Sequence, residues 1–116
     1  MNSGDYKRLI TFQNIQTNDE DQGSYSTEWR AFATVYAAIE PISGKEFNDL
    51  GGMQSTYTHR VRVRAIKGIK PEMRIQYVDG FEGKVRYFNI IHVKDAGTEH
   101  REIQLMCEER SYEQYD

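Results

Sequence analysis

Alternation of apolar and basic side chains over residues 56–66 constrains this chain more than any other feature of its sequence. The side chains at one set of alternate positions are mostly apolar: Tyr57, His59, Val61, Val63 and Ala65. The side chains between them are polar: Thr58, Arg60, Arg62 and Arg64. A period of two places the two sets on opposite faces of a β-strand. Residues 56–66 therefore predict a half-buried strand whose basic face lies outside the core.

Other segments also favour strands, because they are rich in β-branched and aromatic residues and are separated by turn residues. They are residues 6–16, 28–40, 73–78, 84–93 and 101–108. Residues 28–40 are apolar on both faces, as are residues 84–93, and for 28–40 this predicts a strand that is central or covered on both sides. The inward positions of the last segment are Ile103, Leu105 and Cys107. About six consecutive strands with at most one short helix predict an all-β protein, an antiparallel sandwich or barrel.

The chain of 116 residues fits a single domain, residues 1–116. Three polar segments lie outside the predicted strands. Residues 17–27 predict a flexible hairpin tip, and residues 110–116 predict a polar, frayed tail. Residues 43–57 form a connection of about fifteen residues, which is long for a compact domain and is often a sign of function.

The long connection leaves two interpretations open. Ser43 and Glu46 have the spacing of a capping box, and Gly51 and Gly52 would end a short helix begun there. A mobile loop fits the same residues equally well, because few of them are apolar.

Charge and cysteine content narrow the class of protein. The net charge is −3, so any attraction to nucleic acid must come from a local basic patch. The one cysteine, Cys107, cannot form an internal disulfide, which favours a reducing compartment. No apolar run approaches the roughly 18 residues of a membrane span, and the N-terminus has no signal-peptide pattern. We therefore expect a protein made in a cytosol, with no membrane partner.

No residue pattern indicates catalysis, a metal or a cofactor. The possible zinc ligands lack the short paired spacings of zinc sites: they are His59, His92, His100 and Cys107. His59 is expected to be a buried, hydrogen-bonded histidine, and Cys107 an inert buried thiol. Gly51-Gly52 lacks the Lys-Ser/Thr of a phosphate-binding loop, and the acidic residues are scattered. We expect a protein that is not an enzyme.

Three arginines project from one face of the 56–66 strand: Arg60, Arg62 and Arg64. Like charges so close repel each other unless other groups compensate them. They could pair across strands with polar residues such as Glu102, Gln104 and Glu108. They could instead contact phosphate or form an interface with a neighbouring subunit. The sequence leaves these alternatives open.

The order of several short segments resembles the phage head–tail joining (head closure) family of long-tailed bacteriophages. The segments are LITFQ at 9–13, EW at 28–29, FATVYAAIEP at 32–41, SGKE at 43–46, THRVRVR at 58–64, IKPEMRI at 69–75 and REIQLMCE at 101–108. Each is weak alone, and together they cover nearly the whole chain. One departure is the segment 80–87, which is longer than the family's usual turn and leaves the register of that hairpin open.

The resemblance implies a small antiparallel β-barrel of about six strands with one long internal loop. It implies a homo-oligomeric ring, usually twelvefold, below the portal and adaptor proteins in the virion, after assembly in the host cytoplasm. The ring would retain packaged DNA and offer a docking surface to tail terminator or tail tube proteins. Double-stranded DNA would pass it without sequence specificity. By position, the loop that gates the channel would include Gly44, Lys45, Glu46, Phe47, Asn48, Asp49, Leu50, Gly51, Gly52, Met53 and Gln54.

Two alternatives stand beside the head-closure interpretation. The chain could instead be a tail-completion protein, which forms a neighbouring ring and needs a similar shape. A barrel that binds single-stranded nucleic acid would use the arginine face together with Tyr57, Tyr77, Tyr87 and Phe88. The acidic net charge counts against the second alternative.

Overall fold

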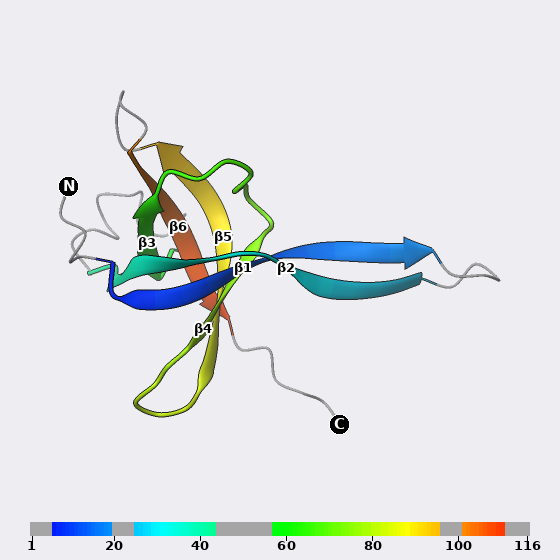
Figure 1. Ribbon diagram of the computed structural model, residues 1–116, viewed down its shortest axis with the longest axis horizontal. Coiled ribbons are helices and arrows are strands. Elements are labelled where there is room, and N and C mark those ends of the chain that lie inside the picture. Colours follow the sequence, from blue (N-terminus) through cyan, green and yellow to red (C-terminus); the bar gives the residue numbers. More distant parts are fainter. Residues whose placement is uncertain (1–5, 20–24, 44–56, 96–100, 111–116) are drawn as a thin grey trace.

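The computed structural model describes residues 6–19, 25–43, 57–95 and 101–110. These residues form six strands and no helix. The strands are β1 (Arg8–Asp19), β2 (Tyr25–Pro41), β3 (His59–Arg64), β4 (Arg74–Val78), β5 (Val85–Asp95) and β6 (Glu102–Arg110). All neighbouring pairs are antiparallel, and the order β1-β2-β3-β6-β5-β4 closes into a barrel (Figure 1). The predicted all-β barrel is confirmed.

The core fills the barrel with side chains that point inward from the strands and from Met73. Its largest fully buried members are Phe12, Phe88, Ile10, Met73, Ile75, Ile90, Leu105, Val61, Val63 and Cys107. The alternation predicted for β3 and β6 is confirmed, because Val61, Val63, Ile103, Leu105 and Cys107 all belong to this core. Closure removes sheet edges over the length of the barrel, so every strand there has two neighbours.

β1 and β2 run well past the barrel. β1 pairs with β4 only over Ile10–Gln13, and β2 pairs with β3 only over Ala37–Pro41. Asn14–Asp19 of β1 and Tyr25–Arg30 of β2 pair with each other as a two-stranded arm that projects from the barrel (Figure 1). Phe32 is the extra residue of a β-bulge where the arm leaves, since Phe12 pairs with Ala33 and Gln13 with Ala31. Such a bulge bends and twists a strand.

The arm corrects the prediction of a hairpin tip over residues 17–27. Thr17–Asp19 pair with Tyr25–Thr27, so the strands continue and the residues between them, 20–24, lie outside the described part. A two-stranded ribbon away from the core needs no apolar face. Its polar sequence therefore carried no strand signal.

A second correction concerns the outer face of β2. Phe32 is 42% exposed and Tyr36 is 60% exposed, so this face is only partly covered by the described part of the chain. The inner face is as expected, with Ala37 buried and Ala33, Val35 and Ile39 packed against the core. The barrel wall is a single layer of sheet. An apolar outer face on it therefore meets solvent unless another molecule covers it.

The β4–β5 connection settles the register that the sequence left open. Val78 pairs with Val85, which leaves a six-residue turn from Asp79 to Lys84. The Asp79 amide donates to the Lys84 carbonyl at 2.7 Å, and the Gly83 amide donates to the Asp79 carbonyl at 2.7 Å. The Asp79 carboxylate accepts a hydrogen bond from the Phe81 amide at 2.9 Å. The turn is thus held by its own hydrogen bonds and carries Phe81 at its tip.

Candidate assembly surfaces

The arginine row of β3 is mostly engaged within the chain. The Arg62 guanidinium lies 3.0 Å from Glu102 and 3.1 Å from Glu40, and Arg60 lies 3.7 Å from Glu40. Hydrogen bonds to Glu40 raise the pKa of Arg62 above its ordinary value. Cross-strand pairing to Glu102 was one of the sequence interpretations. Glu40 was missed, because its place beside Arg60 depends on the β2–β3 register.

The row ends beside the segment that leads into β1. The Tyr6 hydroxyl donates to Glu102 at 2.6 Å, and the Arg64 guanidinium lies 5.9 Å from the centre of the Tyr6 ring. Burial, helped by the Glu102 carboxylate, raises the pKa of Tyr6 to about 12. Of the three arginines only Arg64 is exposed. It is therefore the one best placed to reach another molecule.

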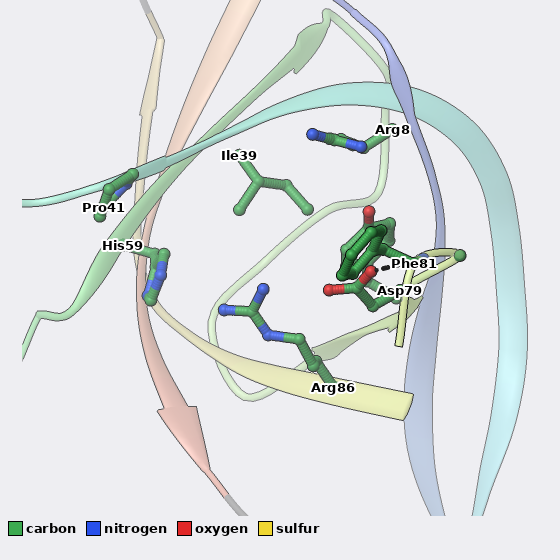
Figure 2. Close-up of a pocket in the computed structure, with 9 residues that line it drawn as sticks. Arg8, Ile39, Pro41, His59, Asp79, Phe81 and Arg86 are labelled. Carbon is green, nitrogen blue, oxygen red and sulfur yellow. Dashed lines mark hydrogen bonds between the residues drawn. The ribbon is translucent and has the colours of Figure 1, made fainter. Parts of the chain in front are cut away.

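One end of the barrel is hollowed and carries charged side chains. The hollow has a volume of about 440 Å³. Figure 2 shows Arg8, His59 and Arg86 projecting toward it and Phe81 at its rim. Arg86 pairs with Glu109 at 2.8 Å, and this hydrogen bond lowers the pKa of Glu109 below its ordinary value. Of the positive groups at the hollow, Arg86 is thus partly neutralised by Glu109 of the neighbouring strand β6.

His59 lines this hollow. Its ring meets Phe88 edge to face at 5.0 Å, and its Nδ1 shares a hydrogen bond of 2.9 Å with the Thr58 hydroxyl. Burial lowers the pKa of His59 below its ordinary value. The residue is half-buried and hydrogen-bonded, close to the prediction.

The long connection leaves and re-enters the barrel at the same end. The Ile42 amide donates to the Thr58 carbonyl at 2.9 Å, which joins the two ends of residues 43–57. The Thr58 amide donates in turn to the Cys107 carbonyl of β6 at 2.8 Å. The gating candidates Gly44–Gln54 lie outside the described residues, so their predicted role stays a prediction.

Side chains that could bind a metal do not cluster in the described residues. No group of three or more His, Cys, Asp or Glu side chains there could hold a metal ion. Cys107 is fully buried, and burial raises the pKa of its thiol well above the ordinary range. His100 lies outside the described part. No helix in that part is long and apolar enough to cross a bilayer.

Arg74 holds the arm to the barrel, which sequence reasoning missed. Its guanidinium is stacked between the rings of Trp29 and Tyr87, 4.2 Å from each centre. Its Nε donates to Gln13 at 2.6 Å, and the residue is only 8% exposed. The interaction joins β1, β2, β4 and β5 where the arm departs. No local pattern marks it, because the four residues are brought together only by strand register.

The aromatic residues proposed for nucleic-acid binding are largely occupied. Tyr77 and Phe88 are buried, and Tyr87 is stacked on Arg74. Base stacking needs exposed ring faces. Together with the engaged arginines, this counts against a barrel that binds single strands.

Comparison with known proteins identifies the family. The family model described as phage head completion protein matches residues 1–110. Among solved structures, the chain is similar to protein SF1141 from Shigella flexneri 2a, with a TM-score of 0.79, 25% identity, and coverage of 97% of this chain and 100% of that one. A chain of the virion of a native gene transfer agent particle has a similar fold, with a TM-score of 0.58, 22% identity, and coverage of 90% and 94%. No curated protein matches. The chain therefore belongs to the phage head completion protein family and is a structural protein of the phage head.

Proposed function

We propose that this chain forms a homo-oligomeric ring, of twelve copies in the usual case of the family it resembles, below the portal and adaptor proteins. There it keeps packaged DNA in the filled head and offers a docking surface to the tail terminator or tail tube proteins. The observation that carries the proposal is the match of residues 1–110 to a head completion family. A similar fold in a chain of a virion particle supports it.

The barrel is suited to a structural role of this kind. Its wall is closed by strand pairing all round, and Arg62 and Arg86 form ion pairs with glutamates of neighbouring strands. The apolar outer face at Phe32 and Tyr36 suits contact with other protein subunits. Such a component needs no catalytic group, and double-stranded DNA would pass it without sequence readout.

DNA retention gives the direct test of the function. Filled heads produced without this chain should lose their DNA or expose it to added DNase, and the purified chain should restore protection. If such heads stay sealed without the chain, the head-closure proposal is wrong. If they stay sealed and the purified chain binds isolated tails, the tail-completion alternative replaces it.

The loop is tested by removing Gly44–Gln54. The base of the loop is closed by the Ile42–Thr58 hydrogen bond, so the barrel should still fold. Circular dichroism checks that the shortened chain folds. Protection of the packaged DNA from added DNase measures whether the assembled heads are closed. Leaking heads that contain the shortened chain support a gating role for the loop, whereas sealed and infectious heads contradict it.

A further inference from the structure

The β1–β2 arm leaves an open strand edge where it projects from the barrel (Figure 1). β1 pairs with β4 only as far as Gln13, whereas it stays paired with β2 as far as Asp19. No other strand of the described residues pairs with Asn14–Asp19. Every second residue of this segment therefore directs its backbone N–H and C=O groups away from β2. The open edge is about 20 Å long at the rise of an extended strand.

The two edges of the arm differ in how well they are protected against the addition of a strand. The β2 edge has the bulge at Phe32 and the ion pair of Glu28 and Arg30, and both bulges and charges hinder such addition. The β1 edge has no charge and no proline from Asn14 to Asn18, and its pairing with β2 is regular there. An unprotected edge is a template on which another extended segment can pair.

A fixed turn limits the strand that the β1 edge can hold. Next to the barrel, the edge borders a hollow of about 300 Å³ lined by Asn14, Ile15, Gln16 and the turn Lys70–Met73. The Met73 amide donates to the Lys70 carbonyl at 3.4 Å, and the Glu72 amide donates to the Ile90 carbonyl at 3.2 Å, so the turn is held on both sides. A strand added antiparallel to β1 lies in line with β4 and must end or turn away at this hollow.

One side chain of the edge indicates what the added strand carries. Ile15 is 48% exposed and lies directly opposite Trp29, so the two side chains share one face of the arm. An apolar side chain opposite Ile15 extends this row onto the added strand. Two β1 edges do not supply it to each other, because residues that pair must direct their backbone groups the same way. A symmetric pairing along most of the edge therefore sets Ile15 opposite Thr17 or Asp19 of the other copy.

We propose that the β1 edge, Asn14–Asp19, accepts an antiparallel strand from a different protein of the phage particle, with an apolar side chain facing Ile15. The partner is an extended segment whose backbone completes the hydrogen bonds of the edge. Its chain ends or turns away at the hollow beside Lys70–Met73. The inference goes beyond the proposed ring, because the edge can hold such a strand whether or not copies of this chain form a ring.

Hydrogen exchange, measured residue by residue with mass spectrometry, tests whether the edge is open and then filled. In the free protein the outward amides of Asn14–Asp19 should exchange fast, and the amides bonded to β2 more slowly. In isolated phage particles the outward amides should exchange at least about tenfold more slowly, the factor that corresponds to one net hydrogen bond. Protection already present in the free protein, or no added protection in the particle, overturns the proposal.

A matched pair of proline variants tests the edge itself. Opposing residues of the arm direct their amides either toward each other or both outward. Gln16 lies opposite Glu28, and Thr17 lies opposite Thr27, so exchange in the free protein shows which pair points outward. In that pair, proline on β1 (Gln16→Pro or Thr17→Pro) should abolish the added protection in particles, because proline has no N–H to donate. The change on β2 (Glu28→Pro or Thr27→Pro) should leave the protection intact. If the two prolines act alike in variants that fold by circular dichroism, the β1 edge is not the site.

Cross-linking identifies the occupant of the edge. A benzophenone attached to Gln16→Cys, at an exposed position, should link in isolated particles to a peptide of another particle protein. The native Cys107 is buried and does not take the label. Links only to peptides of this chain would overturn the proposal, because the chain would then cover the edge itself.

Discussion

Replacing Arg74 with alanine removes the group that fastens the arm to the barrel. Arg74 is 8% exposed, and its guanidinium lies 4.2 Å from the centres of the Trp29 and Tyr87 rings and donates to Gln13 at 2.6 Å. Alanine leaves both rings facing a gap and leaves Gln13 without this donor. We expect the barrel to fold and the arm to lose its fixed direction.

The magnitude follows from the interactions that the guanidinium makes. A desolvated cation–π interaction contributes roughly 1–2 kcal/mol, and a hydrogen bond from a charged donor contributes about 1.5–3 kcal/mol. Because these contributions share one side chain and do not simply add, we expect the free energy of unfolding to fall by about 3 kcal/mol. For a domain of this size that corresponds to a fall in Tm on the order of 10 °C.

Urea unfolding followed by tryptophan fluorescence is the assay, because Trp29 is the one tryptophan and lies in the stack. Arg74→Lys keeps the charge but not the flat guanidinium, so it should recover only part of the stability. Arg30→Ala, on the same arm, is the matched control. The Arg30 side chain is 55% exposed and pairs with Glu28, so removing it should cost less than about 0.5 kcal/mol.

The reasoning is refuted if Arg74→Ala costs less than about 1 kcal/mol, or no more than Arg30→Ala. Full stability of Arg74→Lys would show that charge alone matters and that the stacking geometry does not.

Three further predictions concern single side chains. Burial lowers the pKa of His59, so as the pH falls the unfolded chain binds a proton at this residue before the folded chain does. The free energy of unfolding should therefore decrease as the pH drops below about 6.5. In His59→Gln this decrease should be smaller, which unfolding measurements at about pH 7.5 and about pH 5.5 would show. Gly68 has φ +95°, and a Cβ at this position would lie 2.6 Å from the Phe32 ring. Gly68→Ala should therefore lower the free energy of unfolding by about 1–3 kcal/mol, and by less when Phe32 is also replaced by alanine. An equal loss of stability with and without Phe32 would contradict the contact. The Cys107 thiol should not react with a disulfide reagent until the chain unfolds, and rapid reaction of the native protein would show that its burial is wrong.

The strands and the inward faces could be predicted because they depend on local alternation. Val61 and Val63 point inward in β3, as their spacing required, and so do Leu105 and Cys107 in β6. Apolar and polar residues alternate along a strand wherever one of its faces is buried and the other is exposed to solvent.

Features that depend on pairing between distant strands could not be predicted. Glu40 meets the arginine row only through the β2–β3 register, and Arg74 meets its two rings only because the barrel closes. The outer part of the arm, residues 17–19 and 25–27, was missed for a different reason: a ribbon outside the core needs no apolar pattern. The exposed Phe32 and Tyr36 misled the interpretation of β2, because an apolar outer face suggests a second layer of the same chain as readily as a partner molecule.

We propose above that copies of this chain form the ring that completes the head. Cryo-electron microscopy of connectors isolated from infectious particles tests it most directly. We predict a ring of these six-stranded barrels below the adaptor, with residues 43–57 entering the channel from the barrel end at Ile42 and Thr58. A connector without such barrels at that level, or barrels found only within the tail, would contradict the account.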